Sequence, residues 1–136
     1  MDLVFPPPHY ILFEPLNDTN MLKIWSEYKQ KNKDCEYEVF DASMNHSVET
    51  FAPWIESWMS RMPSKKTRFR VLLILHSEFL TFSCQQVLRR LLEQRSFRCR
   101  VWFHIEDPTG LQAAIQSRCI IKRIPTYLHA VKYKTL

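Results

Sequence analysis

The stretch that decides the fold is RVLLIL, residues 70–75, in which five consecutive apolar side chains follow one arginine. Successive side chains of a strand point to opposite faces, so an unbroken apolar run indicates cover on both faces. Strands of this kind are typical of parallel sheets that lie between two layers of helices. We therefore expect residues 70–75 to form a central strand of an α/β domain.

On both sides of this run, short apolar stretches alternate with amphipathic ones. The runs at residues 9–13, 36–40, 100–105 and 119–124 are expected to form the other four strands. Four helices are expected between the strands, with these apolar stripes: Met21, Ile24, Trp25 and Tyr28; Phe51, Ile55, Trp58, Met59 and Met62; Cys84, Val87, Leu88, Leu91 and Leu92; Leu111, Ala114 and Ile115. This alternation predicts a three-layer fold around a five-stranded parallel sheet.

The helix starts are expected at residues that cap helices well. Thr19 and Thr50 precede the first two helices. Ser83 with Gln86 has the spacing of a capping box for the third helix, and Asp107 followed by proline is typical of the start of a fourth.

The composition is that of one packed globular domain. The 136 residues are 46% apolar and 24% charged, and we expect a core over residues 7–125 with a tail over 126–136. No apolar run reaches the roughly 18 residues of a membrane span, and residues 1–5 lack the features of a signal peptide. None of the four cysteines forms a C-x-x-C pair. We expect no metal site, no membrane contact and a reducing intracellular compartment, the nucleus or the cytoplasm.

The chain contains a single glycine, Gly110. A glycine-rich phosphate loop needs several glycines, because its backbone approaches the phosphates closely and takes positive φ angles. The glycine count therefore excludes a Rossmann fingerprint and a working Walker A motif.

Charge is divided unevenly along the chain. Residues 1–60 hold 4 Lys/Arg and 10 Asp/Glu, a net charge of −6, whereas residues 61–136 hold 15 and 4, a net charge of +11. The basic half could contact nucleic acid, or its charges could simply face solvent. The residues that could contact DNA or a partner are Lys65, Lys66, Arg68, Arg89 and Arg90.

Several segments resemble one family. CQQVLRRLLE at 84–93 is similar to the A-Q-x-A-L-R-R-x-M-E helix of clamp-loader subunits, and IQSRC at 115–119 carries their S-R-C motif. FDAS at 40–43 resembles the L-N-A-S-D segment, and LFEP at 12–15 resembles the strand that leads into the Walker A loop. The resemblance spans residues 7–125 and is to the AAA+ small subunits of replication factor C and bacterial delta-prime. It implies a RecA-like AAA+ domain, here without the helical lid and collar domains.

The nucleotide-handling positions depart from that family. At the Walker A position the chain reads EPLNDTNM, residues 14–21, so the glycines are missing and Asn20 and Met21 replace the lysine and the serine or threonine. Glu14 would repel phosphate, and Asn17 belongs to the same degenerate loop. The Walker B position, residues 75–79, keeps one acidic residue, and Glu106 takes the place of the sensor asparagine. The resemblance with these departures implies a pseudo-ATPase that has no cofactor and is not an enzyme.

The S-R-C motif consists of Ser117, Arg118 and Cys119. In the family its arginine reaches a neighbouring subunit's γ-phosphate as a trans-acting finger, so Arg118 could do the same here. Alternatively, Arg118 pairs locally with a carboxylate such as Glu106 or Asp107. We expect its guanidinium at the surface, because Cys119 and Ile121 of the following strand should point inward.

Two further features have less specific interpretations. His76 and Ser77 follow the central strand, where α/β folds bind ligands, but no second base or carboxylate stands at a recognisable spacing for hydrolysis. Trp54 lies off the apolar stripe of the second helix and is either an exposed anchor for a partner or core filling.

The resemblance favours a non-catalytic subunit that acts through protein contacts in a DNA replication or repair assembly. Its partners would be other subunits, AAA+ ATPases or a sliding clamp, and DNA. Two alternatives stay open: a nucleic-acid-binding accessory protein that uses the basic half, and a structural scaffold that kept only the fold.

Overall fold

The computed structural model describes residues 1–15, 20–44, 47–61 and 68–125. Its strands are β1 (Tyr10–Phe13), β2 (Cys35–Asp41), β3 (Phe69–Leu75), β4 (Cys99–Ile105) and β5 (Ile120–Arg123). Its helices are α1 (Asn20–Lys31), α2 (Val48–Ser60), α3 (Phe82–Gln94) and α4 (Ala113–Gln116), with short 3₁₀ turns η1 (Ser77–Phe79) and η2 (Pro108–Gly110). Every predicted strand is present, and each strand end lies within one residue of its prediction.

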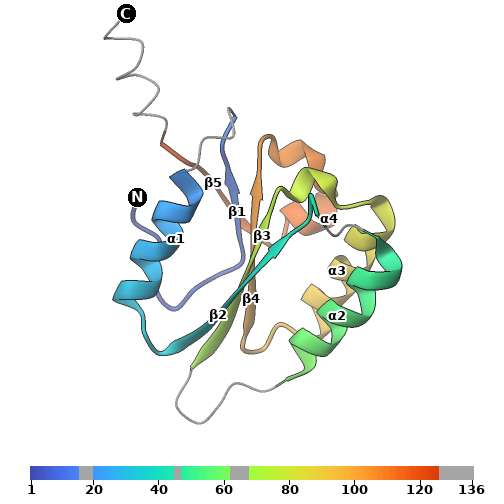
Figure 1. Cartoon of the computed structure of the whole chain (residues 1–136), viewed down its shortest axis with the longest axis horizontal. Coiled ribbons are helices and arrows are strands. Elements are labelled where there is room, and N and C mark those ends of the chain that lie inside the picture. The colour runs from blue at the N-terminus through green and yellow to red at the C-terminus, as the bar shows by residue number, and fades with distance from the viewer. Residues whose placement is uncertain (16–19, 45–46, 62–67, 126–136) are drawn as a thin grey trace, which may run out of the picture.

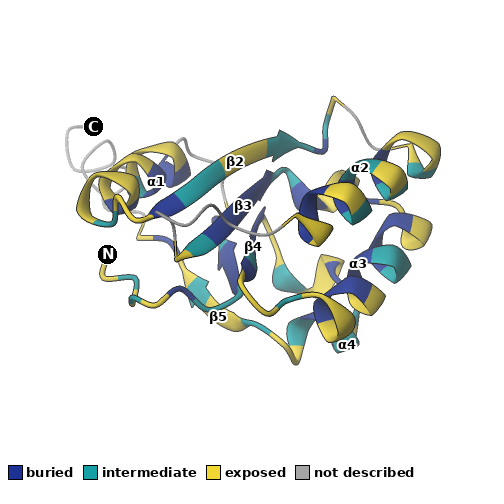
Figure 2. Ribbon diagram, turned by 90° about the horizontal axis from the view of Figure 1, so that it is seen from below, coloured by how far each residue is buried: buried dark blue, intermediate teal, exposed yellow. Residues whose placement is uncertain are grey.

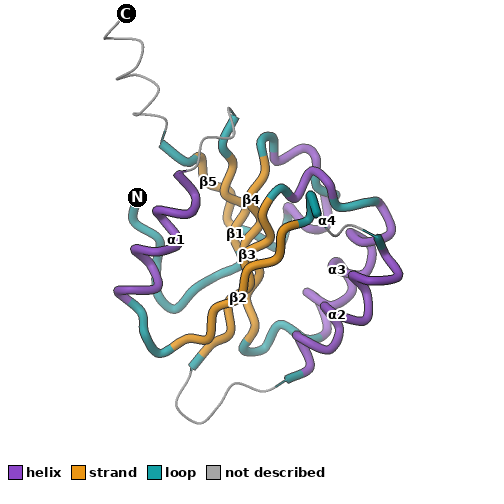
Figure 3. The backbone as a smooth tube through the Cα atoms, viewed as in Figure 1, coloured by secondary structure: helices purple, strands orange, loops and turns teal. Residues whose placement is uncertain are grey.

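The five strands form one sheet in the order β2-β3-β4-β1-β5, and every neighbouring pair is parallel. The predicted three-layer architecture is confirmed: α1 covers one face, and α2, α3 and α4 cover the other (Figures 1 and 3). Because all strands run the same way, their carboxyl ends meet at one edge of the sheet. This is the edge at which open parallel sheets bind ligands.

The sheet divides the apolar core into two clusters. Leu72 and Ile74 of β3 pack toward α2 and α3, whereas Val71 and Leu73 pack toward α1. All four side chains are fully buried, and each such burial contributes about 1.5–3 kcal/mol. Figure 2 shows buried residues concentrated in β3 and β4, with exposed residues on the outer strands β2 and β5. The prediction of a central strand with cover on both faces is confirmed.

Two predicted helix caps are wrong. α2 begins at Val48, and its N-cap is Ser47 in place of Thr50. α3 begins at Phe82, where the Thr81 hydroxyl accepts a hydrogen bond from the backbone N–H of Cys84 at 3.2 Å. Ser83 therefore lies inside the helix and makes no capping box. The predicted cap Thr19 and the predicted stripe residue Met62 lie outside the described residues.

Near the end of the chain the predictions are partly wrong. Asp107 caps the 3₁₀ turn η2 and not a continuous helix, because its carboxylate accepts from Thr109 N at 2.9 Å and the chain is extended again at Leu111. Cys119 packs against the core as expected, but Ile121 is 41% exposed because β5 is an edge strand.

Trp54 is half-buried and packs against the core, with its ring 4.9 Å from that of Phe40. This contact favours core filling over a free anchor. Among the described residues, no helix combines the length and apolar character needed to cross a bilayer.

Candidate functional site

A buried carboxylate–imidazole pair lies at the carboxyl edge of the sheet. Glu14 directly follows β1, and its backbone N–H donates to Ile105 O at 2.9 Å, which extends the β1–β4 pairing. His104 lies on β4 opposite Leu12. Its Nε2 is 2.9 Å from Oε1 of Glu14, and both side chains are buried. The two central strands therefore bring together residues that are 90 positions apart.

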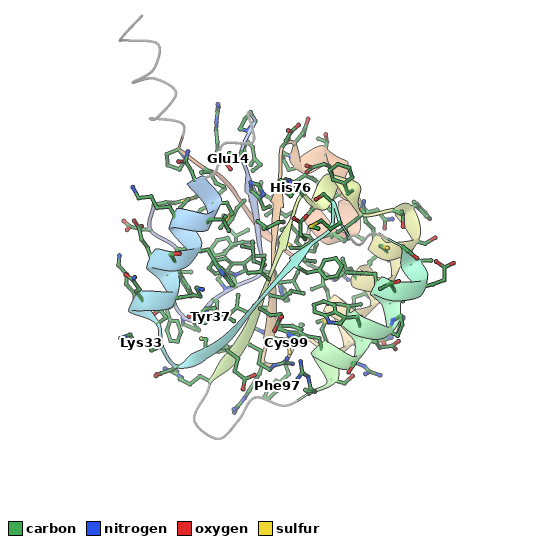
Figure 4. All side chains as sticks on the ribbon, viewed as in Figure 1. Glu14, Lys33, Tyr37, His76, Phe97 and Cys99 are labelled. Carbon is green, nitrogen blue, oxygen red and sulfur yellow. The ribbon has the colours of Figure 1, made fainter. Side chains whose placement is uncertain are left out.

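A second pair, His76 and Glu78, lies next to the first at the end of β3. The His76 ring lies 5.8 Å from the His104 ring between centroids, and His76 Nδ1 lies 3.7 Å from Oε1 of Glu78. His76 has a φ of 55°, in the left-handed region that a non-glycine residue seldom adopts. Figure 4 shows Glu14 and His76 at the same end of the sheet. Within the described ranges, no three of the His, Cys, Asp and Glu side chains are placed to share a metal ion.

Burial, and to a smaller extent the neighbouring His76, lower the pKa of His104 from 6.5 to about 4, against the opposite effect of Glu78 and Glu106. The imidazole is therefore neutral near pH 7 and donates its Nε2–H to the Glu14 carboxylate. The buried carboxylate thus has a hydrogen-bond donor, which a buried polar group requires.

The residues at the degenerate nucleotide loop are tied into the fold. Asn20 begins α1, is buried, and donates from Nδ2 to Pro125 O at 3.3 Å. Met21 is buried in the cluster between α1 and the sheet. Asn17 lies outside the described residues. Asn20 and Met21 therefore serve local packing, and neither offers a cation.

An open groove lies beside this edge, between the segments that follow β1 and β4. It is lined by Phe13, Pro15, Glu106, Asp107 and Pro108. Hydrogen bonds from Thr109 lower the pKa of the Asp107 carboxyl, which keeps it ionised. The described residues that directly follow β1, β3 and β4 (14–15, 76–80 and 106–110) include three glutamates and one aspartate but no lysine or arginine.

Arg118 lies at the surface after α4, as predicted. Its guanidinium pairs with Glu93 of α3, and its Nη1 donates to Ala114 O at 2.8 Å. Arg118 therefore has a local carboxylate partner, but this partner is Glu93 and not the predicted Glu106 or Asp107. Both members of the pair are partly open to solvent, at 33% exposure for Arg118 and 46% for Glu93.

The rest of the S-R-C motif is structural. The Ser117 hydroxyl donates to Ala114 O at 3.0 Å, in the last turn before β5. Burial raises the pKa of the Cys119 thiol to about 12. The thiol is therefore neutral and unreactive near pH 7.

The other predicted contact residues are dispersed. Arg90 is exposed and lies 3.4 Å from Glu56 of α2, and Arg89 beside it is also exposed. Arg68 lies near β3 with its guanidinium 5.3 Å from the Phe5 ring. Lys65 and Lys66 lie outside the described residues.

The sequence analysis missed His104. The sequence marks His104 only as a polar residue within the apolar run 100–105. Its contact with Glu14 could not be inferred without knowing that β4 lies next to β1.

Comparisons with known proteins agree with this architecture. No family model matches the chain. The chain is 28% identical to replication factor C subunit 4 of Encephalitozoon cuniculi (strain GB-M1) over 131 residues, which are 95% of this chain and 42% of that protein. The chain is therefore similar to a replication factor C subunit over nearly its whole length. The resemblance predicted from residues 84–93 and 115–119 is thereby confirmed.

Solved structures share the fold of this chain. A DNA polymerase III gamma subunit-related protein from Thermotoga maritima superposes with a TM-score of 0.61 at 12% identity, over 93% of this chain and 44% of that one. The RuvB Holliday junction branch migration motor of the same organism has a TM-score of 0.60 at 18% identity, over 87% and 38%. The chain spans less than half the length of each relative that it matches here.

Proposed function

We propose that this clamp-loader-like domain is a non-catalytic subunit of a DNA replication or repair assembly, and that it acts through protein contacts without binding nucleotide. The observation that carries the proposal is the buried Glu14–His104 pair. It lies at the end of β1, where the resemblance places the start of the phosphate loop.

Electrostatics supports the loss of nucleotide binding. A nucleoside triphosphate carries several negative charges, and proteins bind it with backbone N–H groups, cations and magnesium. Here the ends of β1, β3 and β4 place Glu14, Glu78 and Glu106 near one another. Bringing phosphate beside a buried carboxylate in a medium of low dielectric constant is strongly unfavourable.

Isothermal titration of Mg-ATP into the intact chain tests the first part of the proposal, with a functional ATPase titrated in the same buffer as the positive control. We expect no heat of binding. The variant Glu14→Gln, which removes the carboxyl group and keeps an acceptor for His104, should also give none, because Asn20 still donates to Pro125 O and Met21 is buried in the core. A micromolar dissociation constant for the wild type would overturn this part.

Affinity purification of the tagged chain with mass spectrometry tests the second part. We expect other AAA+ subunits or a sliding clamp among the recovered proteins, in the nucleus or the cytoplasm. Recovery of nucleic acid alone would favour an accessory nucleic-acid-binding role, and recovery of unrelated structural proteins would favour a scaffold. Either of these two results would contradict the proposal.

A further inference from the structure

The amino-terminal edge of the sheet, opposite the Glu14–His104 pair, carries a groove between the carboxyl ends of α2 and α3. We call it the basic groove; it is lined by Met59, Ser60, Arg61, Arg95, Phe97, Arg98 and Cys99. Figure 4 shows Phe97 and Cys99 at this end of the molecule, far from Glu14 and His76.

The base of the basic groove is apolar. Met59 and Cys99 are both buried core residues, and the Cys99 thiol lies 3.7 Å from Met59 O. Burial raises the pKa of this thiol, so it is neutral near pH 7. Phe97 stands beside them and is 77% exposed. An exposed aromatic ring next to an apolar base is a surface that favours an apolar side chain from a partner.

The rim of the basic groove is cationic and uncompensated. Arg61, Arg95 and Arg98 are all exposed, and none forms an ion pair within the described part of the chain. Arg95 donates to the Ser60 hydroxyl, and the Arg98 guanidinium lies 5.5 Å from the Phe97 ring centre. Three positive charges therefore surround one apolar hollow.

The neighbouring carboxylates already have cationic partners. Glu36 pairs with Arg70, Glu56 with Arg90 and Glu93 with Arg118. Among the described residues, Arg61, Arg95 and Arg98 thus have no carboxylate partner, and a ligand with complementary charge is favoured at the basic groove.

We propose that the basic groove binds an acidic peptide segment of a protein partner, with a large apolar side chain seated against Phe97 and carboxylates on the arginines. Arginine pairs with carboxylates through two parallel hydrogen bonds, and aromatic anchors with arginine are typical of binding hot spots. The inference concerns the edge opposite the nucleotide position and holds whether or not the domain binds nucleotide.

A peptide fits better than single-stranded nucleic acid. A nucleic-acid strand carries a phosphate at every nucleotide and needs a positive track along its whole length. Beside the groove, the Glu56–Arg90 and Glu93–Arg118 ion pairs on α2 and α3 add no net positive charge, so they do not extend such a track. A peptide can place its carboxylates only where the arginines lie and its apolar side chain at Phe97.

Fluorescence anisotropy with three labelled probes tests the proposal on the full chain at about 50 mM salt. The first probe is a decapeptide of glutamates and aspartates around one central phenylalanine. The second replaces that phenylalanine with serine, and the third is an oligothymidine with the same net charge. We expect the phenylalanine peptide to bind most tightly.

Single variants then separate the two elements of the site. Arg98→Glu and Arg61→Glu should each weaken binding of the phenylalanine peptide about tenfold or more, the magnitude expected when a charge-assisted contact is reversed. Phe97→Ala should remove most of the difference between the phenylalanine and serine peptides. Lys23→Glu, which reverses an exposed charge on α1, is the matched control and should leave binding unchanged. Circular dichroism checks that every variant folds.

Three results would overturn the proposal. Tighter binding of oligothymidine than of either peptide would assign the groove to nucleic acid. If Lys23→Glu and Arg98→Glu weakened peptide binding equally, binding would depend on the net charge of the chain and not on the basic groove. Absence of peptide binding by the folded wild type would exclude the site.

Discussion

His104 makes the stability of the domain depend on pH, and His104→Gln should weaken that dependence. In the folded chain burial lowers the pKa of His104 to about 4, whereas the unfolded value is 6.5. The unfolded chain therefore takes up a proton at higher pH than the folded chain does. The stability that this group provides is complete above pH 6.5 and is lost as the pH falls from there toward 4.

The magnitude follows from the size of the shift. Each pKa unit corresponds to about 1.4 kcal/mol, so the full shift of His104 amounts to about 3 kcal/mol. Only 4% of the residue is exposed, so solvent screens this effect little. Between pH 7 and pH 5 about 2 kcal/mol should be lost. His9 behaves similarly, because burial and the nearby charge of Arg100 lower its pKa to about 4. Its Nδ1 accepts a hydrogen bond from Val101 N at 3.0 Å.

Urea unfolding at pH 7 and pH 5 measures the effect for the wild type, His104→Gln and His9→Asn. The glutamine amide can still donate to Glu14, and the asparagine oxygen can still accept from Val101 N, so each variant removes a titration and keeps the hydrogen bond. Each should lose about 2 kcal/mol less than the wild type between the two pH values. If the wild type becomes more stable at pH 5, the Glu14 carboxylate holds His104 protonated in the folded chain and our reasoning fails.

Three further substitutions probe the packing. Arg70→Met should cost about 1–3 kcal/mol in urea unfolding, because the buried Arg70 donates to the backbone oxygens of Trp58 and Arg61 and pairs with the partly exposed Glu36; a cost below about 0.5 kcal/mol would contradict this. Gly110→Ala should change the melting temperature by only a few degrees, since the new Cβ would meet only the flexible end of Ile105 at 3.1 Å. Arg118→Ala should cost under about 1 kcal/mol because its pair with Glu93 is open to solvent, and a larger loss in a thermal melt would show that the pair is structural.

The sheet could be predicted from sequence because its signals are local. The apolar runs of β3 and β4 each fix a buried strand without reference to the rest of the chain. The exact helix starts could not be predicted, because two neighbouring hydroxyl residues could each cap the same helix. Ser47 and Thr50 compete at α2, and Thr81 and Ser83 compete at α3. Tertiary packing selects Ser47 and Thr81. The burial expected for Ile121 was wrong because alternation within a strand does not reveal that the strand is at an edge.

Contacts of the candidate site could not be predicted in the same way. Glu14 and His104 meet only because β1 is placed beside β4, a neighbour relation that depends on strand order and register. The partner of Arg118 was missed for a similar reason. Glu93 is on α3, which packs beside α4, whereas the carboxylates nearest in sequence belong to the turn after β4.

The buried Glu14–His104 hydrogen bond and the surface Arg118–Glu93 ion pair differ in how readily they can be broken. Separating Glu14 from His104 would break a buried hydrogen bond, at a cost of about 1–3 kcal/mol. Separating Arg118 from Glu93 leaves both groups in water, where such pairs contribute less than about 1 kcal/mol. Arg118 could therefore change its partner at little cost, whereas the Glu14–His104 pair is held in the interior of the domain.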